Sequence, residues 1–179
     1  MKNIKNLLYM SSVQMVNYLF PLITIPIVSR AFGPQNIGII NYVAAIVGYF
    51  SLFVNYSFNF TGVRWLTRHP KDKSNLFWCI FFSQLFIFII CTLFFYVFVF
   101  IYSKGEGYSL ICWVSYLSCV AALFTQNWFL QAYSDFKIIA SVSFITKLIS
   151  FVLIVIFISS STDLLKYVVI VNGVSFLSS

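Results

Sequence analysis

The chain has 179 residues, of which 61% are hydrophobic and only 8% are charged. Soluble domains carry roughly 25% charged residues, so these are too few to cover a water-facing surface and we expect an integral membrane protein. The long apolar stretches favour helices over a β-barrel, whose strands would alternate polar and apolar residues. The net charge is +7, and the positive residues lie between the apolar stretches, where they set membrane topology. We therefore expect no nucleic-acid partner.

A helix that crosses a membrane needs about 20 apolar residues. Runs of this kind predict an all-α, polytopic transmembrane bundle with five full spans and part of a sixth. The full spans lie near residues 7–29, 37–63, 76–102, 108–131 and 138–159, and the sixth starts near 164. This last run ends after 16 residues with no polar tail. We therefore expect one transmembrane unit over 1–179 that is an N-terminal fragment, with a C-terminal unit missing.

The first span ends in the stretch "PLITIPIVSRAFGPQNIG", residues 21–38. Pro21 and Pro26 remove backbone donors and predict a bend that would let this helix line a cavity. Arg30 follows at the outer end of the span, where a guanidinium suits a phosphate group. The alternative for Arg30 is an ordinary interfacial arginine.

The second span carries a polar stripe at spacings of three, four or seven residues. Its members are Asn41, Gly48, Ser51, Asn55, Asn59 and Gly62. At 100° per residue they share one face of a continuous helix. Asn55 and Asn59 are candidates for the wall of a polar cavity, and helix–helix hydrogen bonding is the competing interpretation. Arg64 lies on the opposite face, where it either reaches a cavity or extends to lipid phosphates.

The fourth span repeats the pattern more weakly, and here we favour simple close packing. The residues on this face are Cys112, Ser115, Cys119, Ala122 and Gln126. The four cysteines show no metal-ligand spacing, and we interpret them as small apolar side chains. We expect no metal and no cofactor.

Lys147 lies ten residues into the apolar run that starts at Ile138, although a lysine at the centre of a membrane helix costs about 2.5–3.5 kcal/mol on insertion scales. It is either an anchor that reaches the interface or a charge that faces a cavity.

Orientation follows from the lysines and arginines of the short loops. A cytoplasmic N-terminus puts eight on the inside and three on the outside. The inner set is Lys2, Lys5, Arg64, Arg68, Lys71, Lys73, Lys137 and Lys147, and the outer set is Arg30, Lys104 and Lys166. We therefore expect the N-terminus in the cytoplasm.

Two segments resemble the polysaccharide transporter family, the O-antigen and capsule flippases of the multidrug/oligosaccharidyl-lipid/polysaccharide exporter superfamily. The first is "PLITIPIVSRAFGPQNIGIINY", with Arg30, Gly33 and Gly38 at matching positions. The second is "NWFLQAYSDFK" at 127–137, with Trp128, Phe129, Gln131, Asp135 and Lys137. The resemblance covers all 179 residues but only the first half of a usual two-lobed member.

The resemblance implies a non-enzymatic transporter of the bacterial inner membrane. Its substrate would be an undecaprenyl-pyrophosphate-linked oligosaccharide for O-antigen or capsule synthesis, moved by two lobes that rock about a central cavity. Membrane lipids, a polysaccharide polymerase and a chain-length regulator are the other partners implied. Arg30 is the candidate substrate-binding residue that the motif carries over, whereas Arg64, Lys147, Asn55 and Asn59 are inferred from helix faces and depth.

Three alternatives remain open at this point. One is another exporter of the superfamily, either a peptidoglycan-precursor flippase or a drug or cation antiporter. An antiporter should bury an acidic residue to bind its cation, whereas the four acidic residues here lie in loops or at span ends. A second is a polymerase or glycosyltransferase, which would need catalytic carboxylates or a metal site. A third is a truncated product without function.

Overall fold

The computed structural model describes residues 2–69, 72–102, 108–133, 136–158, 160 and 163–177. These residues form helices and contain no strand, as the sequence predicts. The helices are α1 (Lys2–Asn55), α2 (Phe58–Arg68), α3 (Lys73–Tyr102), α4 (Ser109–Phe124), α5 (Asn127–Ala132), α6 (Phe136–Phe157) and α7 (Leu164–Leu177).

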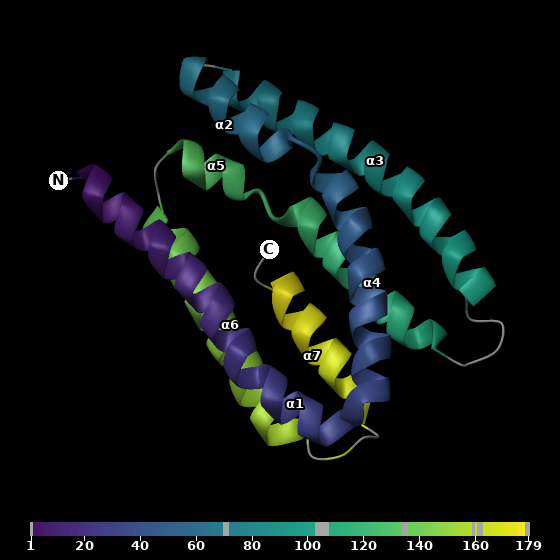
Figure 1. Cartoon of the computed structure of the whole chain (residues 1–179). Coiled ribbons are helices and arrows are strands. Elements are labelled where there is room, and N and C mark those ends of the chain that lie inside the picture. The colour runs from purple at the N-terminus through teal and green to yellow at the C-terminus, as the bar shows by residue number, and fades with distance from the viewer. Residues whose placement is uncertain are drawn as a thin grey trace.

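The long helix α1 consists of two arms that meet at Gly33. Gly33 has φ 71° and ψ 172°, a left-handed conformation that glycine adopts without a Cβ penalty. Pro34 starts the second arm, where its missing N–H is unneeded. The Asn36 side chain donates to the Phe32 carbonyl at 3.1 Å and so satisfies the end of the first arm. The two arms form a V that is open at the top of Figure 1.

The backbone of α1 keeps helical dihedral angles at Pro21 and Pro26. The non-helical residue of α1 is Gly33, in the Gly-Pro turn between the first two predicted spans, and a bend at the two prolines stays a prediction. The first predicted span thus corresponds to one continuous arm.

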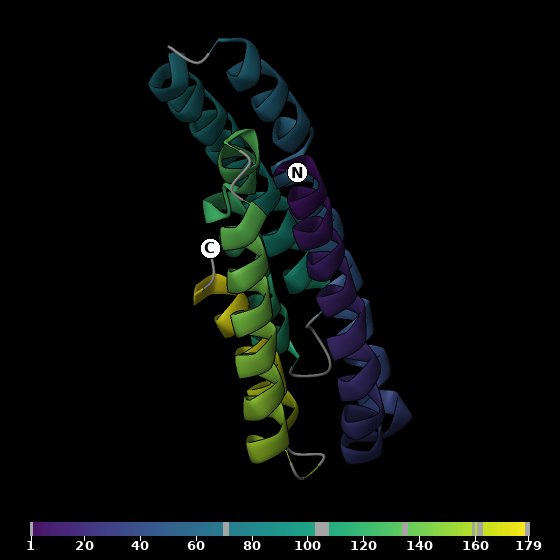
Figure 2. The same ribbon diagram turned by 90° about the vertical axis from the view of Figure 1, so that its left-hand side faces the viewer.

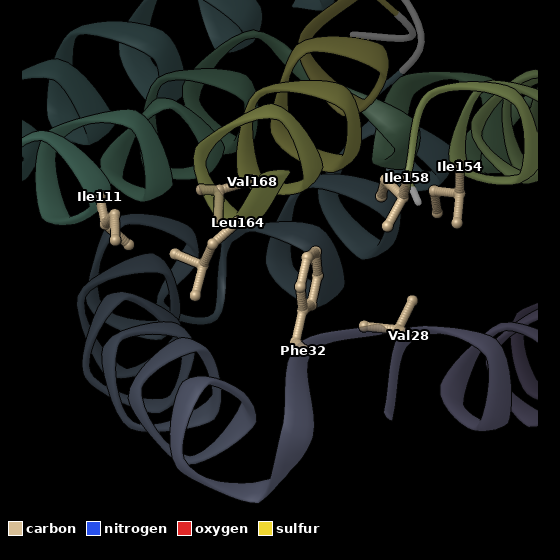
Figure 3. Packing of buried hydrophobic residues seen from close by; sticks show 7 residues of the cluster. All are labelled: Val28, Phe32, Ile111, Ile154, Ile158, Leu164 and Val168. Atoms are coloured by element: carbon tan, nitrogen blue, oxygen red, sulfur yellow. The ribbon is translucent and has the colours of Figure 1, made fainter. Parts of the chain in front are cut away.

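A cluster of seven buried hydrophobic residues fixes the turn at Gly33. Figure 3 shows Val28 and Phe32 of α1 facing side chains from α4, α6 and α7. The other members are Ile111, Ile154, Ile158, Leu164 and Val168. Burial of each such side chain contributes about 1.5–3 kcal/mol when water is the alternative. The cluster joins both arms of α1 to the lower end of the bundle.

The two arms of α1 pack on different helices. The first arm of α1 runs beside α6 (Figure 2), and the second arm packs on α4 and α3. α7 contacts α4 and α6 and lies inside the V in Figure 1. The N-terminus, α2 and α5 all lie toward the open end of the V.

Two predicted spans are interrupted, which corrects their continuous helical assignment. The span predicted over 37–63 breaks at Tyr56 and Ser57, where Tyr56 has φ 39°. The span predicted over 108–131 breaks at Thr125 and Gln126. Neither break contains proline or glycine, so no local signal marked them.

Within the described ranges, four helical stretches are long and apolar enough to cross a membrane, namely Leu8–Arg68, Lys73–Tyr102, Ser109–Ala132 and Phe136–Phe157. The first of these stretches contains both arms of α1, which the sequence predicts as two separate spans. The shorter helix Leu164–Leu177 is also apolar. Large apolar side chains such as Phe82, Phe86 and Leu93 are at least 60% exposed on α3. Such a surface suits lipid tails, whereas soluble monomers rarely expose large apolar patches.

Candidate functional site

A partly open cavity of about 260 Å³ lies between α1, α6 and α7. Its polar lining comes from five side chains of the three helices: Thr24, Asn41, Lys147, Ser150 and Ser175. We call it the Lys147 cavity. A smaller cavity of about 100 Å³ shares Ile25, Asn41 and Tyr167 with it and adds Ser29.

Lys147 is the charged residue of the Lys147 cavity. Because α6 begins at Phe136 and ends at Phe157, Lys147 lies at its middle and not near an end. In the described part of the chain, no carboxylate lies within ion-pair distance of its ammonium, since the ion pair found there joins Lys166 to Asp163 at 2.7 Å. Of the two interpretations that the sequence left open, this position favours a charge facing a cavity over an anchor.

A polar face of α6 extends beyond Lys147. Ser143, Thr146, Lys147 and Ser150 fall within about 100° of the helix circumference. Ser143 and Thr146 line a third cavity, of about 370 Å³, together with the break between α4 and α5. We call it the α5 cavity. The spacing of residues 143, 146, 147 and 150 in the sequence indicates this face, which is not among the faces predicted above.

Arg30 lies apart from Lys147. Its side chain is exposed and lines a shallow depression with Pro26, Ile27 and Ala31, all from the first arm of α1. It is not among the residues that line the Lys147 cavity.

Asn55, Asn59 and Arg64 are not among the residues that line the four cavities described here. The Asn55 amide donates to the Ser51 carbonyl at 3.1 Å within α1. Asn59 lies beyond the break at Tyr56, and its buried Oδ1 has no partner among the described residues. Arg64 is exposed on α2. A binding role for these three residues stays a prediction.

The centre of the second-span stripe packs against the fourth span. The Ser51 hydroxyl lies 3.1 Å from the Cys119 sulfur, and Cys112 and Cys119 are fully buried against Val43 and Val47. Close packing is therefore confirmed for Cys112, Ser115 and Cys119 on the fourth-span face, and Ser51 serves helix–helix contact. Gln126, which was predicted to share this face, lies in the break after α4 and lines the α5 cavity.

A chain of hydrogen bonds holds the break between α4 and α5. Gln126 donates from Nε2 to Gln84 Oε1 and to the Leu123 carbonyl, both at 2.9 Å. Its Oε1 accepts from the fully buried Trp128 indole. The Nε2 of Gln84 is buried without a partner among the described residues.

These bonds predict unequal effects of two similar substitutions. We expect Gln126→Leu to lower thermal stability because it leaves Trp128 and Gln84 with buried unpaired groups, at about 1–3 kcal/mol each. Gln84→Leu should be nearly neutral, since it removes an unpaired amide and Gln126 keeps its bond to Leu123. The measurement is thermal unfolding of the purified protein in detergent. Equal losses in both variants would contradict this account of the break.

No group of three or more histidine, cysteine or acidic side chains with metal-binding geometry occurs among the residues that the structure describes. Polar and cationic groups instead line the cavities beside α6. The arrangement can bind a charged and hydroxylated ligand.

The chain belongs to the polysaccharide biosynthesis protein family, whose model matches residues 4–179. It is 29% identical over 163 residues to an Escherichia coli (strain K12) protein described as "Putative O-antigen transporter". That alignment covers 89% of this chain and 39% of the relative, so the chain spans less than half of the relative's length. No solved structure matches the chain significantly. The match confirms the family that the sequence motifs predicted, and the apolar helices are those of a membrane-embedded protein.

Proposed function

We propose that the protein flips undecaprenyl-pyrophosphate-linked oligosaccharide repeat units across the bacterial inner membrane for O-antigen or capsule synthesis. The observation that carries the proposal is Lys147, a cation at the middle of a membrane helix that lines a cavity and has no carboxylate within ion-pair distance in the described chain. A buried charge is unfavourable without a counter-charge. A pyrophosphate supplies that charge during transport.

Arg30 acts later on the same path in this proposal, because it lies at the outer end of the first arm of α1. It is exposed at the end of the first arm of α1, where a guanidinium can hold a phosphate in bidentate fashion. Asn55, Asn59 and Arg64 form a second group of proposed contacts near the break between α1 and α2. The protein transports without catalysing a reaction, and it needs no cofactor.

The proposed function includes an orientation of the protein in the membrane and a set of functional partners. The N-terminus lies in the cytoplasm, because the positive residues of α2 and the start of α3 are near the same end of the bundle (Figure 1). Besides the lipid-linked oligosaccharide and the surrounding membrane lipids, the functional partners are a polysaccharide polymerase and a chain-length regulator.

Deletion of the gene, followed by quantification of surface polysaccharide, tests this function. We expect the deletion strain to lose surface polysaccharide and to regain it with a plasmid copy of the gene. Unchanged surface polysaccharide, in a strain with no second exporter of this family, would refute the proposal.

Arg30→Ala should reduce plasmid complementation by less than removal of the Lys147 charge does. The reason is that Arg30 is solvent-accessible, where each contact to a phosphate is screened by water and salt. Arg30→Lys should restore part of the loss. Surface polysaccharide per cell is the measurement, with protein amount checked by immunoblot. Full complementation by Arg30→Ala would leave Arg30 as an interfacial anchor.

A further inference from the structure

The α5 cavity has an uncharged lining that is rich in hydrogen-bonding groups. Five of its nine lining residues are polar: Thr125, Gln126, Asn127, Ser143 and Thr146. Its volume of about 370 Å³ falls within the range of about 300–1,000 Å³ for small-molecule sites. Among the residues that the structure describes, no acidic or basic side chain lines it. A neutral polar ligand therefore fits it better than an ion.

Two hydroxyl groups of this cavity are arranged as hydrogen-bond acceptors. Thr146 donates to the Val142 carbonyl at 2.8 Å, and Thr125 donates to the Ala121 carbonyl at 2.7 Å. Because each hydroxyl hydrogen is engaged within its own helix, the oxygen lone pairs remain for a ligand that donates. Sugar hydroxyls are such donors.

An aromatic ring adds an apolar surface to the same cavity. Phe124 lies at the end of α4 and lines the cavity, while its ring makes edge contacts with Phe176 at 6.3 Å between centroids. A ring next to amide and hydroxyl groups matches a pyranose, which has an apolar C–H face and a polar edge.

The α5 cavity is next to the Lys147 cavity along α6. Ser143 and Lys147 are one turn apart, which corresponds to about 6 Å along the helix axis. A lipid-linked sugar carries its first ring directly on the pyrophosphate. A phosphate held at Lys147 would therefore place that ring at or near the α5 cavity.

We propose that the α5 cavity is the subsite for the first sugar of the lipid-linked substrate, with Asn127, Ser143 and Thr146 as the residues that contact its hydroxyls. The inference rests on the proposed function, since it takes the pyrophosphate to be at Lys147. It goes further by assigning the saccharide to a separate group of uncharged residues. It also orients the substrate, with the sugar toward the break between α4 and α5.

The test compares two kinds of lipid with the purified protein in nanodiscs. One is undecaprenyl pyrophosphate, and the other is the same lipid bearing a single N-acetylglucosamine or a single galactose. We expect Thr146→Val and Asn127→Leu each to weaken binding of a sugar-bearing lipid by about threefold to tenfold. Binding of undecaprenyl pyrophosphate should not change, whereas Lys147→Gln should weaken both kinds of lipid.

Thr67→Val is the matched control. Like Thr146, Thr67 donates its hydroxyl to the carbonyls three and four residues earlier, at 3.0 Å each, but it is exposed on α2. We expect this control to leave both affinities unchanged.

Two other outcomes are informative in different ways. If both lipids bind and the cavity variants weaken neither or both alike, the sugar subsite is overturned while the proposed function stands. If neither lipid binds the unmodified protein, the proposed function and the subsite are both overturned.

Discussion

Replacing Lys147 with glutamine should remove most surface polysaccharide from the complemented strain without lowering the amount of protein. Loss of a charge-assisted contact weakens phosphate binding by about tenfold to a hundredfold. The same substitution removes a cation from the middle of α6, where its insertion costs about 2.5–3.5 kcal/mol. Thermal stability should therefore stay equal or rise while transport falls. A fall in transport without a fall in thermal stability distinguishes a binding role of Lys147 from a structural role.

The measurement is surface polysaccharide per cell together with the unfolding midpoint of each purified variant. Lys147→Arg should retain part of the activity because it keeps the charge. Lys73→Gln, at the exposed start of α3, is the control that removes one lysine away from the cavities. If Lys147→Gln complements as well as the unmodified gene, Lys147 is not the phosphate contact.

Gly62→Ala should destabilise the protein strongly for so small a change. A Cβ at Gly62 would lie 2.8 Å from two ring atoms of Trp128 and 3.1 Å from the Ile80 side chain. Trp128 is fully buried in the cluster that joins α2, α3 and α5, so its ring cannot move freely. Overpacking of this kind costs about 1–3 kcal/mol.

Gly48→Ala is the matched control, because nothing lies within 4 Å of the Cβ it would add. This helical position should be neutral or up to about 1 kcal/mol more stable with alanine. Unfolding can be followed with a thiol-reactive dye, since Cys91, Cys112 and Cys119 are buried. The combined loss in Gly62→Ala with Trp128→Leu should be smaller than the sum of the two separate losses, as expected for two residues in contact. Similar midpoints for Gly62→Ala and Gly48→Ala would show that the ring can shift.

The contact of Gly62 with Trp128 gives one family-like segment a structural role. Trp128 belongs to the "NWFLQAYSDFK" segment, and its ring fills the space beneath Gly62 while its indole N–H bonds to Gln126. The break between α4 and α5 is thereby tied to α2. Arg30, in the other segment, is exposed and has no such packing role.

The sequence by itself determined the class of protein, the approximate positions of the helices and the turn at Gly33. These features depend on local chemistry. A run of about 20 apolar residues is sufficient for a membrane helix, and a Gly-Pro pair ends one helix and starts the next. The first, third and fifth predicted spans match helical arms of α1, α3 and α6 closely.

Only the tertiary structure decided the two interruptions and the composition of the cavities. The left-handed Tyr56 and the break at Thr125 have no local signal, because they depend on the packing of Trp128 under Gly62 and on bonds between Gln84 and Gln126. The break at Tyr56 also changes the helical register, so a stripe counted at 100° per residue does not continue to Asn59. A helix shows which residues share a face, but its neighbours determine what that face meets. Ser51 therefore packs on Cys119, whereas Lys147 and Asn41, from helices far apart in the sequence, line one cavity.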